Sequence, residues 1–149
     1  MAKRISPVWD TNKSAPENAA RKLPKLAGRY FKAGRKLLKG RASVEILHRF
    51  RLETKRFRYT LELFRPCYGP GLDQRLALLR KVQDLLGEIN DCVTAKSLIG
   101  RQQKNLTQSL ERRITRRKRE LHRYWRGSFD ATGQDRWWRD YLSRFAKKA

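Results

Sequence analysis

The sequence predicts an all-α protein, an antiparallel four-helix bundle followed by one short C-terminal helix. Apolar residues recur every three or four positions through most of the 149 residues, which is the spacing of one face of an α-helix. No stretch alternates apolar and polar residues with the period of two that marks a half-buried strand. Glycine and proline interrupt the helical pattern at short intervals, so the connections are short and neighbouring helices should run antiparallel.

The N-terminal part of the chain divides into an arm and a helix. Residues 1–14 show no apolar period, and we expect them to form a flexible arm. Ser14, followed three residues later by Glu17, has the pattern of a capping box, so a helix should begin there. This helix is expected over about 16–39, and Gly40, a residue type that commonly terminates helices, should end it.

Two longer helices follow. Ser43 is a good N-cap for the second helix, which is expected over about 44–65 and stops at the turn-forming residues 66–71. The third is expected over about 72–98, where leucine, valine and isoleucine at helical spacing form a core stripe. Gly87 lies on another face of this helix, where it is expected to let a neighbouring helix approach closely.

The chain breaks again after the third helix, and a fourth completes a bundle expected over 15–126. The remaining segment, 127–149, should contain a glycine-bearing loop and a short amphipathic helix. Trp137, Tyr141 and Phe145 recur there every four residues and, together with Trp138, are expected to close the core or form a dimer contact. Stacking on nucleic-acid bases is the alternative for these aromatic residues.

The chain carries a large excess of positive charge. Lys and Arg number 37 against 14 Asp and Glu, which gives a formal net charge of +23 at pH 7. Such self-repulsion opposes compaction unless a polyanion binds, so the expected partner is strongly acidic. Arginine outnumbers lysine by 23 to 14, and its forked guanidinium favours bidentate recognition of phosphate.

Other classes of protein are disfavoured by composition. The two cysteines are too few for a small secreted disulfide scaffold, and their spacing relative to the two histidines fits no metal site. We therefore expect free thiols, no metal ion and no cofactor. No apolar run approaches the roughly 20 residues of a membrane span, and the N-terminus lacks the apolar core of a signal peptide. The expected location is the cytoplasm, with no membrane partner.

The second helix should combine a packing face with a cationic stripe. His48, Arg51, Lys55 and Arg58 recur at i, i+3, i+7 and i+10, so they lie within about 80° of one another around the helix axis. The apolar residues of the same segment form a separate face. A cationic stripe of this kind is suited to holding anions, and phosphate is the preferred candidate.

Two further basic stripes are expected on the first and fourth helices. They contain Lys25, Arg29 and Lys32 on the first helix and Arg112, Arg116 and Arg119 on the fourth. A solvated charged face is the usual explanation of such a pattern. Acidic residues are nearly absent from both stripes, however, so their like charges repel one another until a polyanion binds. Ligand contact and simple solvation are both open for these stripes.

Two motifs in a fixed order carry a family resemblance. Residues 48–62 read H-x-x-R-x-x-x-K-R-x-R-Y-x-x-E, and residues 79–91 read LRKVQDLLGEIND. Together they resemble the CHAD family, the conserved histidine α-helical domain, over roughly residues 20–125. The resemblance implies a fold of two pseudo-symmetric four-helix halves around a cavity whose basic residues bind inorganic polyphosphate. The motif forms look most like the second half.

The resemblance implies that the first motif supplies the polyphosphate ligands, and these are His48, Arg51, Lys55, Arg58 and the adjacent Arg56. Because the chain has room for one half only, a homodimer could rebuild the missing half through an isologous contact. Recruitment to polyphosphate granules is the cellular role that the resemblance suggests.

The residues also allow other interpretations of the cationic stripe. His48 alone would often be a histidine hydrogen-bonded to a neighbour, and the arginines could form solvated pairs with Glu53 or Glu62. A nucleic-acid or ribosome-associated basic protein is the alternative function, since net charge supports it equally well. An enzyme is not expected, because the stripe contains cations and Glu62 without a metal or a positioned base.

Overall fold

The computed structural model describes residues 8–100 and 102–147, and within them it contains helices and no strand. The elements are α1 (Ala15–Leu37), α2 (Val44–Leu63), the 3-10 turn η1 (Arg65–Cys67), α3 (Pro70–Leu98), α4 (Lys104–Tyr124), the π-helical turn η2 (Trp125–Phe129) and α5 (Gln134–Arg144). The prediction of an all-α bundle with a short C-terminal helix is therefore confirmed.

Capping chemistry explains where the first two helices begin. The Ser14 hydroxyl accepts a hydrogen bond from the Glu17 amide at 3.3 Å, and the Ser43 hydroxyl accepts one from the Ile46 amide at 3.2 Å. Each serine thereby satisfies an amide that the first turn of a helix leaves without a partner. The observed bounds of α1, α2 and α3 lie within two residues of the expected ones.

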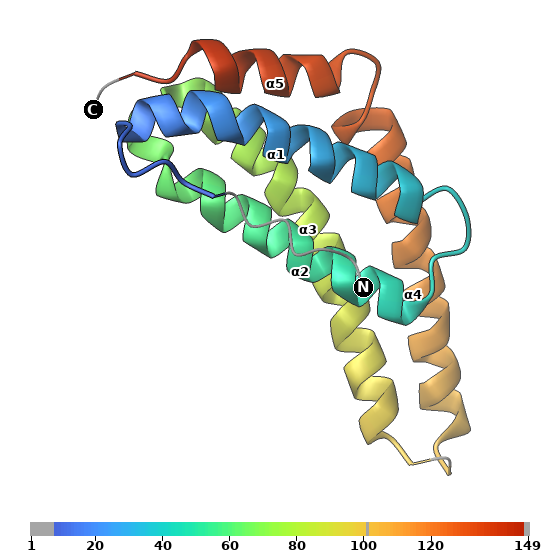
Figure 1. Ribbon diagram of the computed structural model, residues 1–149. Coiled ribbons are helices and arrows are strands. Elements are labelled where there is room, and N and C mark those ends of the chain that lie inside the picture. The colour runs from blue at the N-terminus through green and yellow to red at the C-terminus, as the bar shows by residue number, and fades with distance from the viewer. Residues whose placement is uncertain (1–7, 101, 148–149) are drawn as a thin grey trace.

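The helices form two antiparallel pairs of unequal length (Figure 1). α1 packs on α2 and α5, α2 packs on α3, and α4 packs chiefly on α3. The α3–α4 hairpin is longer than the α1–α2 pair and projects beyond it at the end where α2 begins (Figure 1). The core is therefore concentrated at the other end, where α5 lies along α1.

A cluster of aromatic side chains fills this core, and the π-helical turn η2 contributes to it. The Asp130 amide donates to the Trp125 carbonyl at 2.6 Å, which closes the wider π turn. This turn brings both Trp125 and Phe129 to the interior, where they are 2% and 0% exposed. A Cβ at Gly34 of α1 would lie only 2.1 Å from the Trp125 ring, so the close approach of the indole requires glycine there.

The buried face of α5 differs from the face expected for it. Trp138 and Leu142 are fully buried, whereas Phe145 is 51% exposed and Trp137 lies at the surface. Of the four aromatic residues expected to close the core or form a dimer contact, Trp138 lies in the core and Tyr141 packs against it partly buried, whereas Trp137 and Phe145 do not enter it. The reason is tertiary: α5 packs along α1, and this contact selects the neighbouring stripe.

Trp137 and Tyr141 instead enclose a buried arginine of α3. The guanidinium carbon of Arg75 lies 3.4 Å from the Trp137 ring centroid and 3.9 Å from that of Tyr141. Its Nη1 donates to the Gly71 carbonyl at 2.8 Å and its Nη2 to the Trp137 carbonyl at 2.9 Å. Burial lowers the pKa of Arg75 to about 10, so it remains charged at neutral pH. This arginine fastens α5 to α3.

Residues 8–14 contact the bundle. The Trp9 ring lies 4.9 Å from the Phe64 ring, centroid to centroid, and the Asp10 amide donates to the Asn18 side chain at 2.9 Å. The part of the expected flexible arm formed by residues 1–7 lies outside the described residues. No helix in the described part of the chain is long and apolar enough to cross a membrane.

Candidate anion-binding site

The cationic stripe of α2 lies along its contact with α3, and we call this region the α2–α3 seam. The seam consists of His48, Arg51, Lys55, Arg58 and Glu62 on α2 and of Arg80, Gln83, Gly87 and Asn90 on α3. Its two ends are defined by contacts between the helices. His48 Nδ1 is 3.1 Å from Asn90 Oδ1 at one end. At the other end, Glu62 Oε1 lies 3.4 Å from both Arg58 Nε and Arg80 Nη2.

The middle of the seam is open at Gly87. Since antiparallel helices advance in opposite directions, the contacts at the two ends place Arg51 and Lys55 opposite the stretch from Gln83 to Gly87. A Cβ at Gly87 would meet no heavy atom within 4 Å. The expectation that Gly87 admits a closely packed helix is therefore wrong. Its missing side chain leaves free space beside the basic stripe.

Arg51 and Arg58 of the seam are half-buried and incompletely paired, whereas Arg80 is exposed. The Nε atoms of Arg51 and Arg58 are both buried and have no hydrogen-bond partner among the described residues. Arg58 Nε is close enough to Glu62 for an ion pair, but the geometry makes no hydrogen bond. A buried donor that makes no hydrogen bond costs about 1–3 kcal/mol of stability. A phosphate chain along the seam would supply acceptors that the protein does not, provided that these side chains turn toward it.

Negative charge in and around the seam is sparse and partly neutralised. Glu62 is shared between Arg58 and Arg80, so its single negative charge neutralises only one of the two positive charges beside it. Asp84 and Asp91 are exposed and lie within about 60° of Gly87 around α3. They border the seam, and no ion pair of theirs is found in the described ranges. The described residues contain no cluster of carboxylate, thiol or imidazole groups arranged to hold a metal ion.

Arg56 does not share the seam with its sequence neighbours. It lies about 100° around α2 from Lys55, and its Nη1 donates to Glu53 at 3.0 Å. The structure therefore separates Arg56 from the four other candidate ligands on this helix. Arg56 thus forms the pair with Glu53 that was the alternative interpretation. His48 instead contacts Asn90 of α3, and Arg58 contacts Glu62 within the seam.

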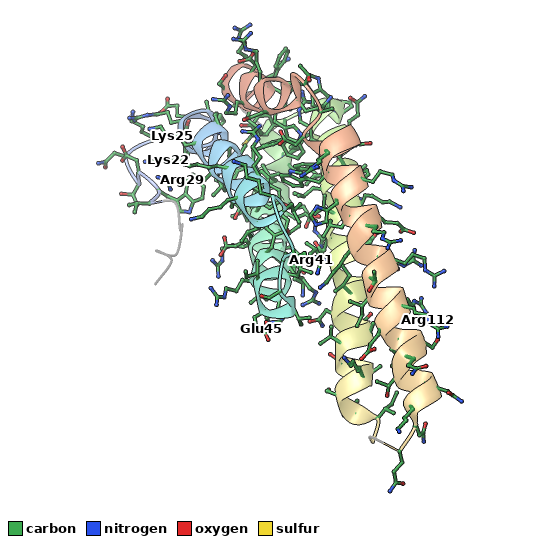
Figure 2. All side chains as sticks on the ribbon, turned by 90° about the vertical axis from the view of Figure 1, so that its right-hand side faces the viewer. Lys22, Lys25, Arg29, Arg41, Glu45 and Arg112 are labelled. Atoms are coloured by element: carbon green, nitrogen blue, oxygen red, sulfur yellow. The ribbon has the colours of Figure 1, made fainter. Side chains whose placement is uncertain are left out.

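The basic stripes of α1 and α4 face other directions. Lys25, Arg29 and Lys32 are all exposed on α1, and Arg112, Arg116 and Arg119 are all exposed on α4. Figure 2 shows Lys25 and Arg29 projecting from α1 on the side away from α4, and Arg112 on the projecting part of α4. The three stripes of the chain thus do not converge on one site.

Three seam residues of α3 were not anticipated as site residues: Arg80, Gln83 and Asn90. Their helical spacing puts them on one face together with Gly87, and this periodicity is the signal that could have identified them. Which helix face meets α2 depends on tertiary packing, so the pairing itself was not accessible from the pattern.

Comparison with protein families identifies a match to the CHAD domain over residues 2–100, which is 99 of the 149 residues. The match contains α1, α2 and α3, and hence the whole seam, and it ends before α4 rather than at about residue 125. Comparison with curated proteins found no match, and neither did comparison with solved structures. The chain therefore belongs to the CHAD domain family, which is associated with the binding of inorganic polyphosphate.

Proposed function

We propose that this chain binds inorganic polyphosphate at the α2–α3 seam and does not hydrolyse it. The observation that carries the proposal is the pair of half-buried arginines, Arg51 and Arg58, whose buried Nε atoms lack partners among the described residues of a seam that is open at Gly87. The family match includes every residue of this site. A string of phosphate groups offers acceptors at short, regular intervals, which suits a row of cations along one helix.

Binding would replace the counterions of the polymer with Arg and Lys side chains. Affinity should then fall with salt, with a slope of about one for each phosphate charge neutralised. Longer chains should bind more tightly, because one molecule can reach the seam and the outlying stripes of α1 and α4 together. Association with polyphosphate granules would follow from such binding.

The absence of catalysis is part of the proposal. Phosphoryl transfer needs a positioned base or a metal in addition to cations. His48 Nδ1 faces the Asn90 side chain and Glu62 lies between Arg58 and Arg80, contacts that support a role in holding the seam together rather than in catalysis. Incubation with polyphosphate and Mg²⁺ should release no inorganic phosphate above the level of a protein-free control.

A homodimer is the assembly that we propose for the two-half architecture of the family. Leu52, Tyr59 and Leu63 are 44%, 52% and 72% exposed and recur at i, i+7 and i+11 on α2, next to the seam. A second copy covering this apolar stripe would bring two seams together across a two-fold axis. Sedimentation of the wild type should show a dimer.

The dimer proposal has a matched control. Leu52→Glu with Leu63→Glu should give a monomer, whereas Leu98→Glu with Leu106→Glu, at exposed sites near the α3–α4 connection, should remain dimeric. A wild type that stays monomeric at all concentrations while binding polyphosphate tightly would rule the dimer out.

A second candidate function is the binding of nucleic acid. The net charge of +23 and the basic stripes facing several directions favour a diffuse cationic surface that any polyanion could occupy. Competition separates the two functions, because a diffuse surface should release polyphosphate when RNA is added at equal charge concentration.

The test is calorimetric titration of long-chain polyphosphate at about 0.15 M salt, with and without excess RNA. The seam variant Arg51→Gln with Arg58→Gln is compared with Arg49→Gln with Arg56→Gln, which removes the same charge from other faces of α2. We expect the seam variant to lose at least tenfold in affinity and the control less than threefold. Equal losses in both variants, or displacement by RNA, would favour the nucleic-acid function instead.

A further inference from the structure

A cationic cavity lies between the α1–α2 turn and α4, and we call it the turn pocket. Its volume is about 730 Å³, within the range of about 300–1,000 Å³ that small-molecule sites occupy. Its charged or titratable lining residues are Arg41 from the turn and Lys118, Arg119, His122 and Arg123 from α4. No carboxylate lines it, so the cavity concentrates positive charge.

The turn pocket is separate from the α2–α3 seam. α3 meets α2 through Arg80 and Asn90, but it meets α4 through the Leu78 carbonyl and Glu88. Leu78 and Arg80, like Glu88 and Asn90, are about 160° apart around the helix axis. α2 and α4 therefore lie on different sides of α3. The pocket also draws most of its lining from α4, which the family match does not include.

The two walls of the pocket, the α1–α2 turn and α4, contact each other directly. Lys118 Nζ donates to the Ala42 carbonyl at 3.3 Å, which ties α4 to the turn. Ala42 itself is buried, so the turn is a fixed wall. Figure 2 shows Arg41 between this turn and α4, and Glu45 in the first turn of α2, close to the turn in sequence but not part of the pocket lining.

The acidic residues near α4 are committed elsewhere. Glu88 and Glu120 both pair with Arg117, which does not line the pocket. Within the described residues, no ion pair forms with Arg41, Arg119 or Arg123. Three guanidinium groups without an ion-pair partner among the described residues and the ammonium of Lys118 therefore line this open cavity.

We propose that the turn pocket is a second binding site, specific for a short linear oligophosphate such as tripolyphosphate or the end of a longer chain. Four permanent cations require a compact ligand with several negative charges, which condensed phosphate provides and a single carboxylate does not. The inference rests on the proposed function only in the choice of condensed phosphate. It does not depend on the seam.

A neighbouring cavity extends the site along α4. This adjoining cavity, of about 600 Å³, shares Thr115 and Arg119 with the turn pocket. It is also lined by Arg112 and Arg116 and by Glu111, whose carboxylate pairs with Lys96. A longer phosphate chain seated by its end in the turn pocket would continue along these arginines. The turn pocket would then hold one end of the phosphate chain, and the arginines of α4 would contact the rest of it.

His122 couples the site to pH. Burial lowers the pKa of His122, with further lowering by Arg126 of η2 and Lys118 of α4, while the Leu38 carbonyl at the end of α1 opposes the shift. Arg41 faces the same cavity from the turn, with Arg119 and Arg123 beside it. A bound anion offsets these cations and favours the imidazolium form. Binding should therefore take up a proton, and affinity should rise as the pH falls.

The test is calorimetric titration of tripolyphosphate into the full chain in buffers of different ionisation enthalpy. Arg119→Gln with Arg123→Gln removes two pocket cations, and Arg113→Gln with Arg136→Gln removes the same charge from exposed positions outside it. We expect at least a tenfold loss of affinity in the first variant and less than twofold in the second. Proton uptake should disappear in His122→Gln.

The outcomes separate this inference from the proposed function. Tripolyphosphate binding that survives Arg51→Gln with Arg58→Gln and is lost in the pocket variant supports a distinct site. Equal loss in the pocket and control variants, or no tripolyphosphate binding, overturns it, whatever long polyphosphate does at the seam. Displacement of tripolyphosphate in proportion to the number of long chains identifies the chain end as a ligand. If long polyphosphate chains do not displace tripolyphosphate, the ligand of the turn pocket is the free oligophosphate rather than the end of a longer chain.

Discussion

Replacing Gly34 with alanine should destabilise the protein by about 2–4 kcal/mol. The added Cβ would lie 2.1 Å and 2.3 Å from two ring carbons of Trp125, whereas ordinary contacts begin near 3.4 Å. The indole would have to move by more than about 1 Å. Trp125 is 2% exposed and packs against Tyr30, Phe50 and Phe129, so it has no free space to enter.

The magnitude follows from two opposing terms. Overpacking a closed core costs about 1–3 kcal/mol and sometimes more, and complete loss of a buried Trp side chain costs about 3–5 kcal/mol. Alanine returns up to about 1 kcal/mol through its higher helix propensity. Because the clash is severe, the destabilisation should lie near the upper end of the range for overpacking. The cost of losing the buried Trp side chain sets its upper limit.

The same helix provides a matched control at Gly28. A Cβ there would meet Arg139 Cδ at 3.5 Å, an ordinary van der Waals contact with a flexible side chain. Gly28→Ala should therefore be neutral or stabilising by up to about 1 kcal/mol. Urea unfolding followed by circular dichroism measures both variants.

A rescue variant tests the mechanism itself. Trp125→Phe removes ring atoms from the clash, so Gly34→Ala should cost less in that background than in the wild type. Additive effects of the two substitutions, or a Gly34→Ala protein as stable as the wild type, would refute the packing argument.

Three further predictions concern a buried cation, two border carboxylates and a histidine. Arg75→Gln removes a guanidinium held between two rings, so hydrogen exchange of α5 amides should accelerate at least tenfold while α2 amides change little. Asp84→Asn with Asp91→Asn removes exposed carboxylates beside the seam, and calorimetry should show polyphosphate affinity rising about threefold, an effect that vanishes at high salt. Because the pKa of His122 is lowered in the folded state, the unfolded chain binds its proton first. The free energy of unfolding should then fall as the pH drops below about 6.5, a slope that His122→Gln reduces in urea titrations at several pH values.

The helices and their limits were accessible from the sequence because their signals are local. Ser14 and Ser43 cap helices by accepting hydrogen bonds from amides three residues away. Apolar periodicity likewise can be recognised within the sequence of a single helix. The cationic stripe from His48 to Arg58 was accessible for the same reason, since helical spacing alone places its members on one face. The family resemblance, carried by two contiguous motifs, is confirmed by the match over residues 2–100.

Tertiary structure decided which faces meet. The pairing of His48 with Asn90, the open space at Gly87 and the separation of Arg56 from the seam all depend on how α2 lies against α3. The burial of Arg75 and the turn pocket require residues more than 60 positions apart to come together. Sequence periodicity gives the angle of a residue around its own helix, but the angle between helices is set by the sum of many packing contacts. For this reason the chain's sequence determined what each helix offers, and only the fold determined which of these cations share a site.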